Sequence, residues 1–224
     1  MQLAEKWRPK TWDDLVGHDK LKATIARYRQ RGCIGGRSFF IRGPSGCGKS
    51  TAGWLICAET ADPFNIEEID ARRLTPAGVE QIRHDMHYRA LGGKPGKGWI
   101  ISEAQGLNKA TLQSLLVLID SPTEPMPDWA VVVFCTTIEG QLTLEGMDDS
   151  GPLLSRCTEL QLDRRGWVTA GKGAPGPAAL RLYQIAEAEG LNGKPIAAYV
   201  KLLQSLNGNL RRAIQAVDSG AMLD

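Results

Sequence analysis

The chain has 224 residues, of which 42% are hydrophobic and 23% are charged, as is ordinary for a globular protein with one large or two small domains. The 27 lysines and arginines against 25 aspartates and glutamates leave a net charge of +2, so any contact with DNA needs a local basic patch. The amino-terminus lacks the apolar core of a signal peptide, and no apolar run approaches the length of about 20 residues that spans a membrane. We therefore expect a cytoplasmic protein without a membrane segment.

The cysteines and histidines do not indicate a metal site. The five cysteines include no C-x-x-C pair, which argues against a zinc ribbon and a disulfide framework and suits a reducing compartment. His84 and His87 lie three residues apart in a segment with a helical pattern, but no third ligand is evident. We expect these two histidines to be exposed or to cap the helix.

The first part of the chain predicts an arm, a helix and a strand. Residues 5–17 are mixed and turn-rich, and Pro9 forces the backbone to enter in an extended conformation. We expect this arm to lie on the domain that follows. Residues 18–31 have apolar side chains at helical spacing, and Gly32 ends that helix. The apolar run within residues 37–42 predicts a short buried strand.

Residues 43–51 match the phosphate-loop pattern G-x-x-x-x-G-K-[ST] at every specified position, and they lie between a strand pattern and a helix pattern. The glycines let successive backbone N–H groups point into one concavity, and the following helix adds its positive dipole end. We expect Lys49 to reach the β- and γ-phosphates and the Ser50 hydroxyl to ligate magnesium. The residues predicted to bind nucleotide here are Gly43, Pro44, Ser45, Gly46, Cys47, Gly48, Lys49, Ser50 and Thr51.

The middle of the chain alternates between strand and helix patterns. Strands are predicted over residues 65–70, 99–101 and 130–134, and helices over residues 75–88 and 108–119. Such alternation predicts a parallel sheet that is covered by helices on both faces. Ligands in sheets of this kind bind beyond the carboxyl ends of the strands.

Two places compete for the acidic residue that a phosphate loop needs at the end of another strand. Ser102-Glu103 directly follows an apolar strand pattern, whereas Asp120 follows the apolar run 116–119. The helical periodicity that begins at Asn108 explains the second run without any chemistry. We therefore favour Glu103 and expect Asp120 to end a helix.

The composition changes at Gly166, where a stretch rich in glycine and proline indicates a linker. Three helical patterns follow, over residues 178–189, 195–206 and 210–219. The predicted domains are an α/β nucleotide-binding domain over residues 1–165, a linker over residues 166–177 and a helical lid over residues 178–224.

These motifs together resemble the AAA+ clamp-loader ATPases, namely the gamma/tau subunit of bacterial DNA polymerase III and the small subunits of replication factor C. The resemblance spans nearly the whole chain, and Ser155-Arg156-Cys157 is close to a family signature. Its other elements are shared with AAA+ proteins at large: residues 6–9, 14–17, 43–51, 102–104 and 208–213. The implied fold is an AAA+ P-loop parallel sheet covered by helices and followed by a small three-helix lid domain.

The resemblance also implies roles for single residues. Glu103 polarises the attacking water, and Thr136 is the sensor of the γ-phosphate. Val16 contacts the nucleotide, and Arg211 is similar to the lid arginine that touches the nucleotide of its own subunit. Arg156 is similar to the arginine that reaches a neighbour's nucleotide in trans, which makes hydrolysis depend on assembly. From the residues alone, both arginines could equally be exposed cations of ordinary helices.

The family assembles as a ring or spiral of related subunits that opens a sliding clamp and holds primer–template DNA. The resemblance therefore implies ATP and Mg²⁺ as cofactors, and clamp-loader subunits, a sliding clamp and DNA as partners. DNA would be bound through its phosphate backbone without base readout. Arg83 and Lys109 are the candidate DNA contacts, although each could simply face solvent from a helix.

Ser102 departs from the family pattern, because active members carry a magnesium-positioning aspartate there. A serine can accept a hydrogen bond from a magnesium-bound water, but it brings no charge, so metal affinity and rate should fall. The leading hypothesis is an ATP-hydrolysing clamp-loader subunit. The alternatives are an ATP-gated scaffold that does not hydrolyse its nucleotide and another DNA-associated AAA+ ATPase. The zinc module and helical collar of the family have no counterpart in this sequence.

Overall fold

The computed structural model describes residues 2–137, 151–164, 166–171 and 174–223. The chain divides into two compact units, which we call the helical unit and the sheet unit. The helical unit comprises Met1–Asp19, Pro44–Gly48 and Leu162–Asp224, and the sheet unit comprises Lys20–Gly43 and Lys49–Gln161. Residues 172 and 173 of the predicted linker lie outside the described residues.

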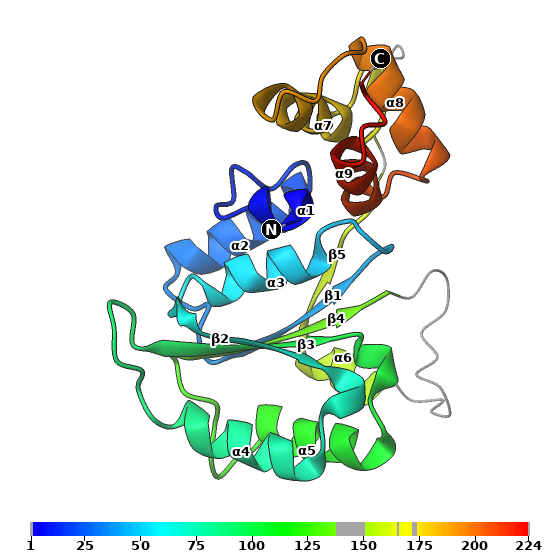
Figure 1. Cartoon of the computed structure of the whole chain (residues 1–224). Helices are drawn as coiled ribbons and strands as arrows, with labels where there is room; N and C mark the ends of the chain where they lie inside the picture. Colours follow the sequence, from blue (N-terminus) through cyan, green and yellow to red (C-terminus); the bar gives the residue numbers. More distant parts are fainter. Residues whose placement is uncertain (1, 138–150, 165, 172–173, 224) are drawn as a thin grey trace. The chain divides into compact units, whose positions relative to one another are not determined.

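The sheet unit is built on five parallel strands in the order β2-β3-β4-β1-β5 (Figure 1). Their bounds are β1 (Arg37–Arg42), β2 (Ala61–Asp70), β3 (Gly96–Ser102), β4 (Ala130–Thr136) and β5 (Thr158–Gln161). All seven residues of the central strand β4, Ala-Val-Val-Val-Phe-Cys-Thr, are buried. An apolar strand of this kind needs cover on both faces, as the predicted parallel sheet requires.

Helices cover both faces of the sheet. Helices α2 (Asp19–Gln30) and α3 (Lys49–Cys57) lie over one face, and α4 (Pro76–Met86) and α5 (Lys109–Ile119) lie over the other, with α6 (Gly151–Arg156) beside α5 (Figure 1). Two short 3-10 turns, η1 (Ala71–Arg73) and η2 (Ala104–Gly106), follow β2 and β3. The predicted α/β class and the predicted parallel sheet are confirmed.

Local sequence signals fix where the helices on the second face begin. The Thr75 hydroxyl accepts a hydrogen bond from the backbone N–H of Gly78, and Pro76 occupies the first turn of α4. The Asn108 side chain accepts a bond from the backbone N–H of Thr111 at 2.9 Å and caps α5. The buried face of α5 includes Leu112, Leu115 and Leu118, whereas Leu116 and Ile119 are only partly buried.

The helical unit contains the short helix α1 (Leu3–Lys6) and the helices α7 (Pro177–Ala188), α8 (Ile196–Ser205) and α9 (Leu210–Asp218). The last three agree with the predicted lid helices within two residues at each end. Their core is apolar and includes Leu182, Ile185, Tyr199, Leu203 and Val217.

The amino-terminal arm belongs to the helical unit, whereas we expected it to lie on the α/β domain. The physical reason is a set of polar contacts with Glu189, at the end of α7. The Trp7 indole N–H donates to this carboxylate at 2.7 Å, and the Lys6 ammonium lies 2.7 Å from it. The Arg181 guanidinium also stacks over the Trp7 ring.

Three short elements are absent from the predicted set: α1, α6 and β5. Strand β3 begins at Gly96, three residues before the predicted strand 99–101, and a side chain at Gly96 would meet the backbone oxygens of Thr60 and Trp129 at 2.4 Å. Across the described parts of the chain, none of the helices has both the length and the apolar character that crossing a membrane requires.

Candidate functional site

The phosphate-loop sequence joins the end of β1 to the start of α3. Gly46 and Gly48 have φ values of +74° and +95°, in the left-handed region that residues with a Cβ rarely adopt. A Cβ added to Gly46 would lie 2.0 Å from the Asn209 side-chain oxygen. The backbone therefore has the glycine-dependent turns that let N–H groups converge on phosphate oxygens, so the loop fits a polyphosphate.

Lys49 is the first residue of α3, and its side chain folds back over the loop. Its ammonium donates a hydrogen bond to the Gly43 carbonyl at 2.8 Å, and the residue is only 9% exposed. Ser50 and Thr51 follow in the first turn of the helix and are partly buried. A buried ammonium and a helix N-terminus beside the same loop form a positive site, as the binding of phosphate requires.

Ser102 ends β3, and Glu103 follows in the left-handed conformation with φ +51°. The Ser102 hydroxyl donates to the carbonyl of Ile69 in the neighbouring strand at 3.2 Å, which leaves its oxygen lone pairs as acceptors. A glutamate is uncommon in left-handed backbone, and such conformations concentrate at functional sites. The structure thus turns the chain sharply at the predicted acidic position.

Gln105, in η2, links Glu103 to the predicted sensor residue. The Thr136 hydroxyl donates to the Gln105 side-chain oxygen at 2.8 Å, and the Gln105 amide donates to the Glu103 carboxylate. The Thr137 hydroxyl donates to the other Glu103 oxygen at 3.2 Å. The Thr137 backbone N–H also donates to the Gln105 side-chain oxygen at 3.4 Å, which closes a hydrogen-bonded ring of Gln105, Glu103 and Thr137 at the carboxyl ends of β3 and β4.

Arg156, the last residue of α6, lies at the opposite end of the strands, beside the amino end of β1. Its backbone oxygen accepts a hydrogen bond from the Ser38 hydroxyl at 3.0 Å, and Ser38 is the second residue of β1. The phosphate loop begins at Gly43, five residues further along that strand, which corresponds to about 16 Å at roughly 3.3 Å per residue. That span exceeds the length of an arginine side chain.

The Arg156 guanidinium pairs with Asp120 in the same chain. Its Nε donates to the Asp120 carboxylate at 2.7 Å, and a terminal nitrogen donates to the Pro152 carbonyl at 2.9 Å. Asp120 is the residue that ends α5, which confirms that it follows a helix and not a strand. Both partners of this ion pair are substantially exposed.

The helical unit contains the remaining predicted residues. Arg211 is exposed in the first turn of α9, and Asn209 caps that helix by accepting a bond from the backbone N–H of Arg212 at 3.1 Å. Val16 is partly buried. Its near neighbour His18 makes a hydrogen bond from its ring to the Cys47 carbonyl in the phosphate loop at 2.9 Å.

Sequence reasoning missed several residues of these clusters. Gln105 lies between two predicted residues, and Arg164 donates to the backbone oxygens of Ser45 and Asn207. Trp167 is 5% exposed, its ring lies 5.3 Å from that of His18, and its buried indole N–H has no hydrogen-bond partner among the described residues. No sequence motif marks these positions, because their partners are distant along the chain.

The candidate DNA contacts differ in their surroundings. Arg83 pairs with Glu80 at 2.9 Å and also with Glu124, so its charge is compensated. Lys109 is exposed at the start of α5. His84 is exposed, and its ring packs on Tyr88 with centroids 4.9 Å apart. His87 is the C-cap of α4, so both histidines have the exposed or capping positions that we expected. The described residues contain no group of three or more side chains that could hold a metal ion.

Comparisons with known proteins give distant relatives. No family model matches the chain. The chain is 23% identical to a replication factor C small subunit from Natronomonas pharaonis. The alignment of 223 residues covers 98% of this chain and 62% of that protein. It is 24% identical to DNA polymerase III subunit tau/gamma from Haemophilus influenzae. That alignment of 183 residues covers 71% of this chain and 25% of that protein. The chain thus spans less than two thirds of each relative.

Solved structures share the fold. The Thermotoga maritima RuvB Holliday junction branch migration motor matches with a TM-score of 0.72 at 23% identity, over 95% of this chain and 64% of that chain. A mutant of the same motor matches with a TM-score of 0.71 at 22% identity, over 95% of this chain and 65% of that chain.

The strand order, the phosphate-loop sequence and these neighbours define a P-loop protein with the AAA+ fold. The sequence is similar, at 23–24% identity, to a replication factor C small subunit and to a DNA polymerase III subunit tau/gamma.

Proposed function

We propose that this protein is an ATP-hydrolysing AAA+ subunit of the clamp-loader type, whose nucleotide site is completed by a neighbouring subunit. The observation that carries the proposal is the position of Arg156. This arginine lies at the amino end of β1, whereas the phosphate loop follows the carboxyl end of the same strand. Because the side chain is too short to reach its own loop, it acts on another subunit's nucleotide or on none.

The phosphate loop binds the nucleotide in this proposal. Lys49 contacts the β- and γ-phosphates, and the Ser50 hydroxyl holds Mg²⁺, with Ser102 bound to the metal through a water. The bound metal supplies charge neutralisation at the phosphates. The glycine turns and the buried ammonium beside Gly43 support this assignment.

The remaining roles concern hydrolysis and the response to nucleotide. Glu103 orients the attacking water, and Thr136 senses the γ-phosphate. Their connection through Gln105 supports a shared role at one edge of the sheet. Val16 and Arg211, in the helical unit, contact the nucleotide of their own chain.

The proposed partners are related clamp-loader subunits, a sliding clamp and primer–template DNA, and the proposed location is the cytoplasm. The names of the two sequence relatives support a role in replication. Of the two DNA candidates, Lys109 is the better one, because acidic side chains already neutralise Arg83. DNA contact would be with phosphates and would weaken with salt.

Ser102 supports a second candidate function, a scaffold that binds ATP without hydrolysing it. Its hydroxyl is engaged by the Ile69 carbonyl and supplies no negative charge for a metal. If the missing charge limits hydrolysis, Ser102→Asp raises turnover while ATP affinity changes little. If Ser102→Asp leaves turnover at zero, the missing charge is not the cause.

The test is ATP turnover by the purified protein, alone and with primed DNA, a sliding clamp and clamp-loader subunits, beside a Lys49→Ala control. Turnover that needs these partners and disappears in Lys49→Ala supports the loader ATPase. Tight ATP binding without turnover under every condition supports the scaffold. Turnover that is unchanged in Lys49→Ala contradicts both candidates.

A further inference from the structure

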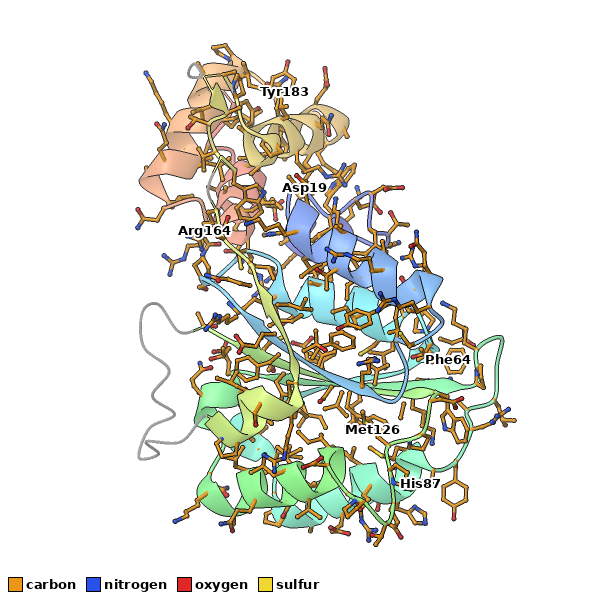
Figure 2. The ribbon with its side chains drawn as sticks, turned by 180° about the vertical axis from the view of Figure 1, so that it is seen from behind. Asp19, Phe64, His87, Met126, Arg164 and Tyr183 are labelled. Atoms are coloured by element: carbon orange, nitrogen blue, oxygen red, sulfur yellow. The ribbon has the colours of Figure 1, made fainter. Side chains whose placement is uncertain are left out.

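A polar cavity of about 300 Å³ lies in the sheet unit, at the edge where β1 and β5 begin. The cavity is lined by residues 36–38 at the start of β1, residues 155–158 at the junction of α6 and β5, and by Ile119 and Met126. Figure 2 labels Met126, on the side of the sheet that carries α4 and α5. The volume is at the lower end of the range for ligand-binding pockets.

The lining of this cavity suits an oxyanion. It contains two arginines, Arg37 and Arg156, and none of its described lining residues is acidic. The hydroxyls of Ser38 and Ser155 already donate to the backbone oxygens of Arg156 and Pro152, so the arginines are the donors that an anion would meet. The forked guanidinium group of arginine binds phosphate oxygens through paired hydrogen bonds. Burial raises the pKa of the neighbouring Cys157 thiol to about 11, so this group adds no negative charge at neutral pH.

Arg37 is held in place by contacts that leave its outer nitrogens available. Its Nε donates to the Cys33 carbonyl at 2.7 Å, and its guanidinium carbon lies 4.9 Å from the centre of the Tyr28 ring. No described hydrogen bond or ion pair engages its two terminal nitrogens. Arg156, in contrast, is engaged by Asp120 and must leave that carboxylate before it can bind another anion.

We propose that this cavity binds the terminal phosphates of a nucleotide that a neighbouring subunit holds, and that Arg37 contacts those phosphates beside Arg156. The proposal rests on the proposed function, and it adds a fixed second guanidinium to the shared site. A free polyphosphate has the same chemistry and would occupy the same cavity. Two measurements distinguish binding of a free polyphosphate from binding of a neighbouring subunit's nucleotide.

The first measurement tests the cavity in a single chain, with inorganic tripolyphosphate as the probe and Lys49→Ala protein to disable the phosphate loop. Calorimetric titration should show binding that weakens at least tenfold when Arg37→Ala is added. The matched control is Arg27→Ala, which removes an exposed arginine whose Nε also contacts the carbonyl four residues earlier, and it should leave binding unchanged. Absence of binding, or equal binding with and without Arg37, overturns the anion site.

The second measurement asks whether Arg37 acts on a neighbour's nucleotide. Arg37→Ala should lower partner-dependent turnover at least tenfold, and mixing it with Lys49→Ala protein should restore part of the activity, because each variant supplies what the other lacks. Arg37→Lys, which keeps the charge but loses the fork, should retain intermediate activity and serves as a variant with smaller structural effects. Thermal melting checks that all variants are folded.

The outcomes separate this inference from the proposed function. Full activity in Arg37→Ala, with loss of activity in Arg156→Ala, overturns the role of Arg37 and leaves the proposed function intact. Failure of the Arg37→Ala and Lys49→Ala mixture to recover activity shows that Arg37 acts within its own chain and also overturns it. If the wild-type protein has no turnover, the proposed hydrolytic function is wrong. The tripolyphosphate titration then still tests whether the cavity binds an anion through Arg37.

Discussion

At the scale of single residues, Gln105 is the side chain that connects the proposed water-orienting carboxylate to the proposed phosphate sensor. Its oxygen accepts from the hydroxyl of Thr136, a residue that is 1% exposed, and its amide donates to Glu103. One glutamine thus satisfies a buried hydroxyl and fixes a carboxylate. It contacts neither phosphate nor water in this account and is therefore a positioning residue.

We expect Gln105→Leu to have two separable effects. The buried Thr136 hydroxyl would lose its acceptor, which should lower the free energy of unfolding by about 1–3 kcal/mol. Misplacement of Glu103 should lower kcat roughly ten- to a hundredfold. The Kd for ATP should change little, because the phosphate loop is untouched. Urea unfolding and steady-state turnover measure the two effects.

The matched control is Gln113→Leu, which replaces an exposed glutamine on α5. It should change neither stability nor turnover appreciably. A Gln105→Leu variant with normal kcat would show that Glu103 does not depend on this ring of hydrogen bonds.

The Asp70 carboxyl gives a pH prediction. Its pKa is lowered to about 2, first by the hydrogen bond from the Arg72 side chain and then by the Arg72 backbone N–H. Because the pKa in the folded state is below the unfolded value of about 3.9, the stabilising contribution is present above about pH 4. It is lost as the pH falls through about 2.

An NMR titration of the Asp70 carboxyl checks this prediction. Arg72→Ala should raise the pKa of Asp70 toward its ordinary value, whereas Arg73→Ala should have a much smaller effect, since only Arg72 donates to the carboxylate. An unchanged Asp70 pKa in Arg72→Ala would contradict the assigned cause.

Residues in a fixed local pattern could be predicted from the sequence, and residues defined by distant contacts could not. Lys49 and Glu103 follow apolar strands at recognisable spacing. Gln105 and Arg37 carry no such signal, because Thr136 and the α6–β5 junction approach them only after folding. The prediction that Asp120 ends a helix was confirmed, because helical periodicity is visible within a single segment.

At the scale of elements, length and burial decided what could be predicted. The strands β1, β3 and β4 are continuous apolar runs, and the lid helices repeat apolar residues at helical spacing. The missing elements, α1, α6 and β5, have 4, 6 and 4 residues, which is too short for a period to be seen. β5 pairs with β1 from 119 positions away in the sequence at the register Phe39–Thr158, so no local signal indicates it.

Packing of α3 on the sheet depends on a glycine of β3. A Cβ added to Gly98 would lie 2.5 Å from the Cβ of Cys57 in α3, so Gly98→Ala must displace the helix or the strand. We expect it to lower the free energy of unfolding by about 1–3 kcal/mol or more. Because α3 begins with Lys49, we also expect weaker ATP binding. Chemical denaturation and nucleotide titration test both effects.

Gly171→Ala is the control for this prediction, because no atom of the described residues lies within 4 Å of an added Cβ there. It should leave stability unchanged or slightly raised, since alanine restricts the unfolded chain. Equal stability of Gly98→Ala and the wild type would contradict the described packing of α3 on β3.

At the scale of the whole molecule, opposite ends of the strands of one sheet carry different parts of the proposed site. The Glu103 ring lies at the carboxyl ends of the strands, and Arg156 lies at the amino end of β1. In the proposed function, one chain therefore has the parts of a complete site but cannot bring them together by itself. Assembly is then the condition for hydrolysis, and a partner that brings subunits together controls the rate.

The measurement that tests this claim most directly is a mixing experiment with two inactive variants. Lys49→Ala lacks the phosphate-binding lysine and Arg156→Ala lacks the arginine supplied to the neighbour, and the latter alone should cost ~10³-fold or more in turnover. With the partners present, the mixture should hydrolyse ATP well above either variant alone. A mixture as inactive as its components, beside an active wild type, would show that Arg156 does not complete a neighbour's site.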